Sequence, residues 1–283
     1  MKRLIVLQLL MAAVVVCRSQ DDITICHTEP TEKFAFLASN KEFNASHPTP
    51  RRYVHNSVAG GKMIQFKCPD GSTANGYVLT ADTKTDNWIL VFQEWWGLND
   101  NIKRESESFF TDLGNVNVLA LDMYDGKLAT ERDAAAQYMQ AFKQERGDVI
   151  VKGALAYVGK SARIGTVGWC FGGGQSLLAA LQAGKQSAAC VIYYGMPVED
   201  VSVLKKLNAD VLGIFGVKDQ WINPDVVKKF EANMKTAGKN LVVHSYDADH
   251  GFANPSNPLG AFNETAYKDA YQHTVSFFKE RLK

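Results

Sequence analysis

The chain lacks several features that would indicate particular classes of protein. Its 31 basic residues nearly balance its 30 acidic ones, and they are scattered rather than clustered. We therefore expect no nucleic-acid partner, since such proteins concentrate positive charge on one face. The cysteines include no C-x-x-C spacing, which argues against a dithiol redox site. The sequence has no internal repeat, no low-complexity segment and, after its first twenty residues, no long apolar run. These absences favour a globular protein with a single core.

The first twenty residues differ from the rest of the chain. Lys2 and Arg3 precede a mostly apolar run over residues 4–16, and the small residues Cys17 and Ser19 follow it. This order is typical of a secretory signal peptide. We expect residues 1–20 to be removed and the mature chain to be secreted, or to reside in another extracytoplasmic compartment, with no membrane contact after cleavage. The alternatives are an uncleaved anchor, which the short apolar run disfavours, and a lipid-modified Cys17, which bulky Val16 disfavours.

Export changes the expected state of the cysteines. An oxidising compartment favours pairing, and Cys26 and Cys68 form the disulfide candidate because both lie outside the predicted core sheet. Cys190 lies in the apolar run 188–192, where a buried free thiol is the expected state.

The remaining chain divides into an extension and one domain. Residues 21–60 are polar, with prolines at 30, 48 and 50. We interpret them as an N-terminal extension that lies over the surface of a domain. Residues 61–283 alternate strand and helix patterns after an antiparallel hairpin. We predict strands at 63–68, 76–79, 88–92, 117–121, 163–167, 188–194, 211–215 and 241–246, and helices at 101–113, 131–146, 149–159, from 173, 201–207, 224–238 and 263–282. Repeated β-α units imply an α/β domain with a mainly parallel sheet that binds ligands beyond the carboxyl ends of its strands.

The most informative stretch is the G-x-C-x-G pentapeptide Gly168-Trp169-Cys170-Phe171-Gly172. It joins a predicted strand to a predicted helix, and a sharp turn there forces its central residue into a strained conformation above the sheet edge. This geometry predicts that Cys170 is a nucleophile. The alternative is a buried free cysteine in a glycine-rich turn.

Two later strand-end loops supply partners for a thiol nucleophile. Asp219 follows the strand 211–215 and His250 follows the strand 241–246, in the order nucleophile, acid, histidine that elbow folds use. Asp219 alone would be a turn or helix-cap aspartate, and His250 alone would as often be a structural residue. Weaker candidates for the acid are Asp125, Asp247 and Asp249; we assign structural or surface roles to His27, His47, His55, His244 and His273.

Acyl transfer also needs donors for the oxyanion of its tetrahedral intermediate. One donor is expected to be the backbone N–H of Phe171, directly after the nucleophile. The second is expected near Trp95, in the loop after the strand 88–92.

These residues together resemble the dienelactone hydrolase family of the α/β-hydrolase superfamily. The resemblance runs from about residue 60 to the C-terminus and rests on Gln93-Glu94-Trp95-Trp96-Gly97-Leu98-Asn99, Leu121-Asp122-Met123-Tyr124, the elbow with Gly173, Asp219 and His250-Gly251-Phe252. It implies an α/β-hydrolase fold, with helices on both faces of the sheet, and a Cys170–His250–Asp219 triad. Such a triad would cleave a small-molecule ester or lactone through an acyl-cysteine, without a cofactor or a metal.

The resemblance also gives Glu94 a role that the residues alone do not. In the family, the glutamate at this position keeps the resting thiol protonated and shifts when substrate binds. A carboxylate beside a thiol opposes thiolate formation by its charge, and the alternative for Glu94 is an exposed strand-end carboxylate.

The sequence departs from the family at two positions that bind the substrate. The archetypal enzymes hold a substrate carboxylate with two arginines, and Gly126 and Asn254 occupy those positions here. Lys127 offers a point charge but not a bidentate fork. We expect a more apolar pocket, for which the candidate lining residues are Trp96, Tyr124, Lys127, Trp221 and Phe252, with Trp95 and Phe171 beside them.

Three functions remain in competition on this basis. The leading one is a cysteine-nucleophile ester or lactone hydrolase. The second is a catalytically silent hydrolase fold that binds a hydrophobic small molecule, which fold alone does not exclude. The third, a thiol redox or sensor protein, is disfavoured because a resolving cysteine is missing.

Overall fold

The fold is that of a computed structural model, which describes residues 29–51, 53–256 and 261–283. The expected signal peptide and Cys26 lie outside the described residues, so the proposed Cys26–Cys68 pairing stays a prediction. Among the described residues, no helix is both long and apolar enough to cross a membrane.

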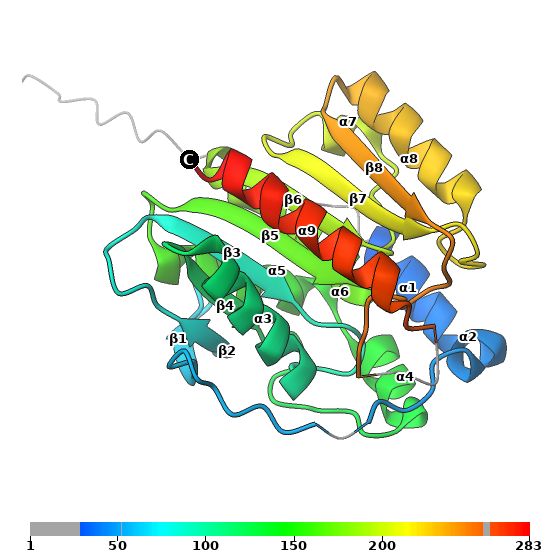
Figure 1. Cartoon of the computed structure of the whole chain (residues 1–283), viewed down its shortest axis with the longest axis horizontal. Coiled ribbons are helices and arrows are strands. Elements are labelled where there is room, and N and C mark those ends of the chain that lie inside the picture. Colours follow the sequence, from blue (N-terminus) through cyan, green and yellow to red (C-terminus); the bar gives the residue numbers. More distant parts are fainter. Residues whose placement is uncertain (1–28, 52, 257–260) are drawn as a thin grey trace, which may run out of the picture.

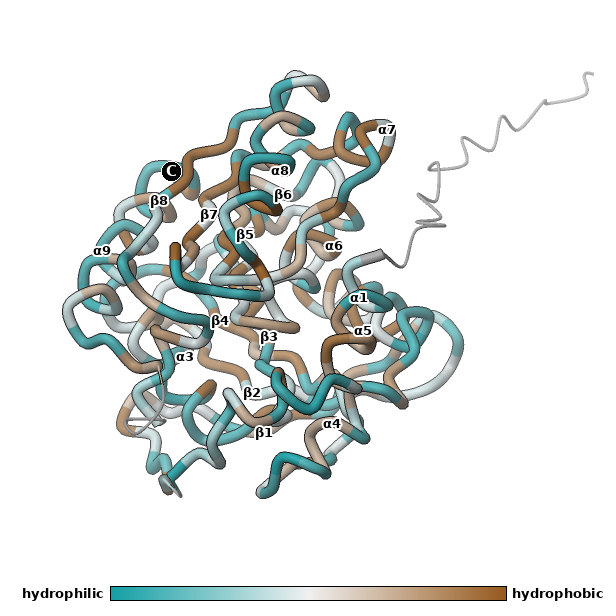
Figure 2. Tube along the Cα trace, turned by 90° about the vertical axis from the view of Figure 1, so that its right-hand side faces the viewer, coloured by the Kyte–Doolittle hydropathy of each residue, from teal (hydrophilic) through white to brown (hydrophobic). Residues whose placement is uncertain are grey.

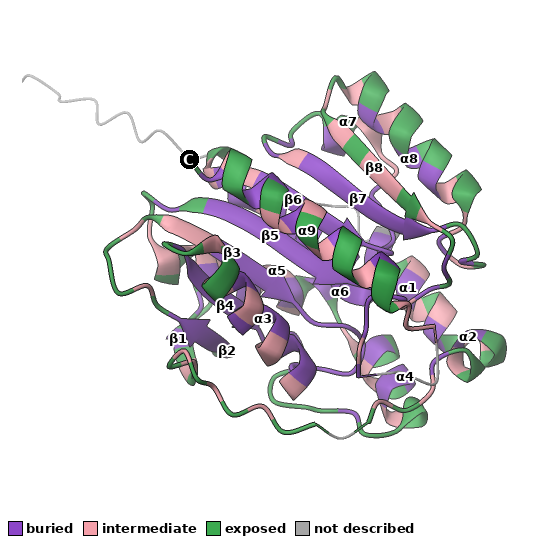
Figure 3. Ribbon diagram, viewed as in Figure 1, coloured by how far each residue is buried: buried purple, intermediate pink, exposed green. Residues whose placement is uncertain are grey.

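One eight-stranded sheet forms the centre of the molecule, in the order β1-β2-β4-β3-β5-β6-β7-β8. The strands β1 and β2 pair antiparallel, as predicted, and the six strands from β3 to β8 run parallel. Figure 2 shows apolar residues concentrated along the central strands, and Figure 3 shows those strands buried. The strand bounds are β1 Lys62–Lys67, β2 Thr73–Leu79, β3 Asn87–Phe92, β4 Asn117–Leu121, β5 Arg163–Trp169, β6 Ser187–Tyr193, β7 Asp210–Gly216 and β8 Leu241–Tyr246.

Helices cover both faces of this sheet (Figure 1). The helices α3 and α9 pack on one face, while α5 and α6 pack on the other. The bounds are α3 Asp100–Leu113, α4 Arg132–Ala141, α5 Gln144–Val158, α6 Phe171–Ala183, α7 Val201–Leu204, α8 Pro224–Ala237 and α9 Glu264–Arg281, with a 3-10 turn, η1, at Gly184–Gln186. This arrangement confirms the predicted fold class.

The sheet order identifies where a ligand is expected. From β3 the chain moves to β4 on one side and then returns to β5 on the other, so β3 and β5 are neighbours at a topological switch point. In open α/β sheets, ligands bind outside the carboxyl ends of the strands at such a point. Glu94 and Trp95 follow β3 there, and Cys170 follows β5.

The N-terminal extension is more ordered than its sequence predicts. Residues 29–45 form two helices, α1 Glu29–Ser39 and α2 Lys41–Ala45, separated by Asn40. The side-chain oxygen of Asn40 accepts hydrogen bonds from the N–H groups of Glu42 (2.7 Å) and Phe43 (3.1 Å), which caps α2. The helix α1 packs against α4 and α6.

A buried polar cluster anchors α1 to the domain. Gln175, on α6, donates hydrogen bonds to the hydroxyl of Thr31 (2.9 Å) and to the side-chain oxygen of Gln144 (2.8 Å), and Thr31 also bonds Gln144. Because unpaired buried polar groups are costly, these three residues fix α1 in one position.

The boundary between the fourth and fifth helices differs from the prediction. The break lies at Phe142 and Lys143, which are extended, rather than after residue 146. The ring of Phe142 lies 5.0 Å from that of Phe171, centre to centre, so the chain leaves its helix to pack beside the elbow.

Candidate active site

The elbow holds Cys170 at the end of β5 in a strained conformation. Cys170 has φ 59° and ψ −121°, a region that residues with a side chain rarely adopt. The turn is possible because its flanks are glycines: a Cβ on Gly168 would lie 2.0 Å from the carbonyl oxygen of Gly172, and one on Gly172 would lie 2.4 Å from that of Gln93. The predicted strand–turn–helix geometry is therefore present.

His250 and Asp219 come together beside the thiol. The Nδ1 of His250 lies 2.7 Å from Oδ2 of Asp219, and the other carboxylate oxygen accepts from the N–H groups of Trp221 (2.8 Å) and Ile222 (2.9 Å). These bonds orient the ring so that Nε2 remains without a hydrogen-bond partner. One ring nitrogen of His250 and Sγ of Cys170 lie within 4.8 Å of each other.

The charges of this pair are set by burial and by each other. Burial disfavours charge on His250, but the charge and hydrogen bond of Asp219, together with the adjacent Cys170, outweigh it and hold the histidine pKa well above its ordinary value. The pKa of Asp219 is lowered: burial opposes ionisation, but the charge and hydrogen bond of His250 prevail. The geometry therefore suits an imidazole that accepts a proton.

Glu94 adjoins the thiol and is held by Asn254. The Oε2 of Glu94 accepts a hydrogen bond from Nδ2 of Asn254 at 2.5 Å. The amide oxygen of Asn254 accepts in turn from the N–H of Ser256 (2.9 Å), from its hydroxyl (2.5 Å) and from Asn101 (3.3 Å). Burial raises the pKa of Glu94 to about 7, although His250 and Asn254 work against that rise.

The thiol itself is disfavoured as a thiolate at rest. Burial raises the pKa of Cys170, and the charge of Glu94 raises it further. His250 and the N–H of Phe171 act in the opposite direction. The surroundings therefore hold the sulfur protonated while keeping a base and a backbone donor beside it.

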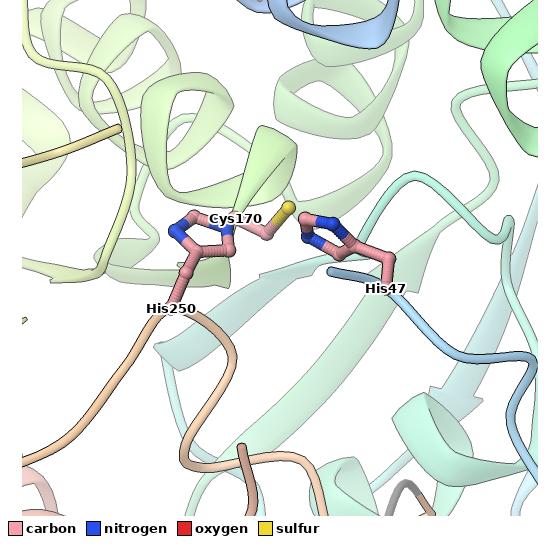
Figure 4. A group of neighbouring side chains, drawn as sticks. All are labelled: His47, Cys170 and His250. Atoms are coloured by element: carbon pink, nitrogen blue, oxygen red, sulfur yellow. The ribbon is translucent and has the colours of Figure 1, made fainter. Parts of the chain in front are cut away.

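His47 enters the same site from the N-terminal extension, so it is buried rather than on the surface, a position that its sequence does not predict. Its ring lies 5.2 Å from that of His250 and 4.8 Å from that of Trp95, centre to centre. The Nδ1 of His47 lies 2.7 Å from the carbonyl oxygen of Phe43, so this nitrogen carries the proton, and Nε2 has no partner. Burial and the charge of His250 lower its pKa to about 3, so the ring is neutral. Figure 4 shows the sulfur of Cys170 between the two rings.

The helix α2 covers the sulfur. Phe43, fully buried, packs its ring 5.4 Å from Trp95, 5.4 Å from Trp221 and 5.9 Å from His250. The remaining cavity holds about 10 Å³, room for no more than one water. Its lining residues are Ser46, His47, Glu94, Trp95, Trp96, Cys170, His250, Gly251 and Asn254. A larger hollow of about 340 Å³ adjoins His250 on the outer side, between α2 and Trp221.

The other predicted pocket residues separate into four places. Trp96 lines the cavity at the sulfur and Trp221 lines the outer hollow. Tyr124 and Lys127 line a third hollow of about 240 Å³, where the Lys127 ammonium lies 5.7 Å from the ring centre of Tyr138. Phe252 lies in the core, packed 5.5 Å from Tyr194 and 5.3 Å from Tyr246. The structure therefore does not bring these five residues together as one pocket.

Sequence reasoning missed Phe43, His47 and Tyr194 at this site. Tyr194 lies one residue after β6, has φ 36°, and places its ring 5.1 Å from that of His250. A signal for α1 existed, since the buried residues Thr31, Phe34 and Ala38 recur at helical spacing. No local signal indicates that the extension returns to the active-site edge.

Comparisons with known proteins agree with this architecture. The sequence profile of the dienelactone hydrolase family matches residues 74–282. The carboxymethylenebutenolidase of Pseudomonas putida is 27% identical over 211 residues, covering 69% of this chain and 86% of that protein. The protein usf of Aquifex pyrophilus is 27% identical over 234 residues, covering 78% of this chain and 99% of that protein.

Solved structures share the fold at lower identity. A dienelactone hydrolase-like promiscuous phosphotriesterase from metagenomic libraries superposes with a TM-score of 0.69 at 20% identity, covering 79% of this chain and 99% of its own. The dienelactone hydrolase of Anabaena variabilis gives a TM-score of 0.59 at 17% identity, covering 79% and 98%. These findings confirm the predicted fold and the class of enzyme, an ester or lactone hydrolase. The chain belongs to the dienelactone hydrolase family.

Proposed function

We propose that this protein hydrolyses a small-molecule ester or lactone through an acyl-cysteine on Cys170, with His250 as the base and Asp219 as the group that orients it. The observation that carries the proposal is the strained elbow cysteine beside a histidine whose far nitrogen is fixed 2.7 Å from a buried aspartate. This arrangement meets the requirements of nucleophilic catalysis: a nucleophile, a base within reach and a third group that orients the base.

The first half-reaction forms the thioester. Sγ of Cys170 attacks the carbonyl carbon while Nε2 of His250 takes the thiol proton. The C–O bond of the tetrahedral intermediate then breaks, and His250 returns the proton to the departing alkoxide. In a lactone, this alcohol stays attached to the acyl group. The backbone N–H groups of Phe171 and Trp95 are our candidates for holding the oxyanion, and losing one such donor typically costs about 100- to 1000-fold in rate.

The second half-reaction restores the enzyme. His250 takes a proton from a water that attacks the thioester carbonyl, and the C–S bond breaks to release the carboxylic acid and the Cys170 thiol. Both half-reactions use the same base and oxyanion donors. We therefore expect no separate residue for deacylation.

We propose that Glu94 keeps the resting thiol protonated. Its charge raises the pKa of Cys170, and its bond with Asn254 fixes the carboxyl group beside the sulfur. A protonated thiol resists oxidation, since oxidants react with exposed thiolate. This protection suits the exported location that we propose for the mature chain on the basis of its expected leader.

We propose that substrate reaches Cys170 by displacing α2. The cavity at the sulfur has no room for an ester, while the outer hollow beside His250 is large enough for a small molecule. Movement of the short helix α2, which contributes Ser46 and His47 at its C-terminal end, would join the two spaces.

Turnover of activated esters and lactones by the purified protein, together with Cys170→Ala and His250→Ala, tests the proposal. We expect hydrolysis by the wild type and loss of about 1000-fold or more in each variant. Far-UV circular dichroism should show that both variants fold. Absence of turnover with tight binding of an apolar ester, unaffected by Cys170→Ala, would instead support the catalytically silent binding protein.

A further inference from the structure

His47 lies beside Cys170 and His250, and these three side chains together have the composition of a metal site. One ring nitrogen each of His47 and His250 and the Sγ of Cys170 all lie within 4.8 Å of one another, and all three residues are buried. Figure 4 shows the three side chains gathered around one point. Thiolate and imidazole are the ligands that zinc prefers, usually three from the protein with water in the fourth position.

Both histidines make the hydrogen bonds that are typical of metal-binding histidines. A ligating histidine donates its other ring N–H to a carboxylate or a backbone carbonyl, which fixes its orientation and tautomer. Here Nδ1 of His250 lies 2.7 Å from Asp219, and Nδ1 of His47 lies 2.7 Å from the carbonyl oxygen of Phe43. Within the described part of the chain, the Nε2 atoms of both rings are buried and have no hydrogen-bond partner. Two unpartnered imidazole nitrogens therefore adjoin one thiol.

We propose that Zn²⁺ binds reversibly to Nε2 of His47, Nε2 of His250 and Sγ of Cys170, and that the bound ion silences the enzyme. Bond lengths of about 2.3 Å to sulfur and about 2.0 Å to nitrogen place neighbouring ligand atoms about 3.5 Å apart. Since the three atoms lie within 4.8 Å of one another, the side chains need to close by no more than about 1.3 Å to reach that spacing. Zinc replaces the thiol proton of Cys170 and any proton on Nε2 of His250, so binding releases two protons when His250 is charged and one when it is neutral.

The position of His47 explains why this site belongs to the N-terminal extension. His47 follows α2, and α2 is held by Phe43 against Trp95 and Trp221. Zinc would therefore tie the extension to the catalytic residues, and displacement of α2 by substrate would remove one ligand. The silencing rests on the proposed hydrolase function, whereas the binding of zinc does not.

Zinc binding is measured by titration against a chromophoric chelator, with the purified protein and no ester present. We expect one tightly bound ion in the wild type. His47→Gln, which keeps a side chain of similar size but removes the imidazole ligand, should weaken binding by about 100-fold. The matched control is His273→Ala, because the partly exposed rings of His244 and His273 stack 3.8 Å apart and are a rival site; it should leave the tight site unchanged.

Two further readouts separate a metal site from a packing role of His47. Co²⁺ bound at this site should show a thiolate charge-transfer band that Cys170→Ala abolishes. Zinc should also protect Cys170 from alkylation in the wild type but not in His47→Gln, and Mg²⁺ should have no effect. Equal zinc affinity in the wild type and His47→Gln, or alkylation of Cys170 at the same rate with and without zinc, would overturn the site.

The effect of zinc on ester hydrolysis is measured in a separate experiment. We expect zinc to inhibit ester hydrolysis and a chelator to restore it. Tight zinc binding that leaves hydrolysis unchanged would overturn the silencing, while a protein that binds zinc but hydrolyses no ester would overturn the proposed function and leave the metal site standing.

Discussion

The carboxyl group of Glu94 changes its charge within the range of pH where the enzyme is expected to work. Burial holds its pKa at about 7, so the group is neutral in mild acid and negative in mild base. The negative form raises the pKa of Cys170. The masking of the thiol is therefore expected to strengthen as the pH rises through 7, which is the opposite of the usual trend for a free cysteine.

Replacing Glu94 with glutamine tests this charge effect directly. Glutamine keeps an oxygen for Asn254 to bond but never ionises. At about pH 8 we expect iodoacetamide to alkylate Cys170 up to about tenfold faster in Glu94→Gln, since one pKa unit is a tenfold change in thiolate, and at about pH 5.5 we expect equal rates. The measurement is the second-order rate constant at both pH values. Identical rates at both would remove the masking role.

The residues around Cys170 also predict the charge of the substrate. Neither lysine nor arginine lines the described cavity at the sulfur, and the N–H of Gly126 is bonded to Asp122 at 2.5 Å. Asn254 is occupied by Glu94, and Lys127 lies in a different hollow. A substrate carboxylate would therefore find no lysine or arginine partner on this side.

We expect kcat/KM to be about 10- to 100-fold higher for a neutral lactone than for a matched lactone that bears a carboxylate. This factor corresponds to one or two charge-assisted hydrogen bonds that the carboxylate would lack in this site. The preference should increase above about pH 7, when Glu94 becomes negative. Steady-state kinetics on the two lactones measure it. Faster hydrolysis of the charged lactone would contradict this reading of Gly126 and Asn254.

At the scale of elements, helices α1 and α2 lie over the carboxyl ends of the strands; we call these two helices the strap. Phe34 on α1 is buried, with its ring 5.7 Å from Phe43 and 6.4 Å from Phe171. Phe36 on the same helix is 74% exposed. The two residues therefore form a matched pair for loosening the strap.

We expect Phe34→Ala to open the strap while Phe36→Ala leaves it closed. A buried Phe→Ala change costs about 3–5 kcal/mol, and local opening of residues 29–47 limits how much of that cost reaches the rest of the domain. The expected results are faster amide exchange over this segment and faster alkylation of Cys170. Unchanged exchange in Phe34→Ala, or an equal effect of both variants, would show that the strap does not gate the thiol.

The elements that sequence predicts well are those with a repeating local pattern. The parallel strands and the elbow follow from apolar runs and from Gly168 and Gly172, and parallel strands bring the residues after them to one edge. That is why the order of the strands points to Cys170, Asp219 and His250, whereas the role of Glu94 comes only from the family resemblance. The helices α1 and α2 are short and lie in a polar segment bordered by prolines, which hides them from sequence analysis. The docking of His47 depends on Thr31 and Gln175, which are far apart in the chain.

At the scale of the whole molecule, the buried carboxyl group of Glu94 lowers stability when it ionises. Its pKa is about 7 in the folded chain, raised from an ordinary 4.5. The neutral form fits the buried site, so its contribution to stability is fully present below about pH 4.5 and is lost as the pH rises through 7. The loss approaches about 3 kcal/mol, because each pKa unit corresponds to about 1.4 kcal/mol.

The free energy of unfolding by urea should therefore fall between about pH 5 and about pH 8 more steeply in the wild type than in Glu94→Gln, with a difference of up to about 3 kcal/mol. The variant does not titrate at this position, so the comparison cancels the other ionisable groups. Parallel pH profiles of the two proteins would show that Glu94 is not held neutral by burial.

The central claim is that Cys170 carries the acyl group during turnover. Its most direct measurement is rapid-quench mass spectrometry of the protein mixed with an activated acetyl ester. We predict one acetyl group on the peptide that contains Cys170, forming before steady-state product release, absent in Cys170→Ala and slowed in His250→Ala. Turnover of the ester by the wild type without any acetyl group on Cys170, or with the same rate in Cys170→Ala, would contradict the account.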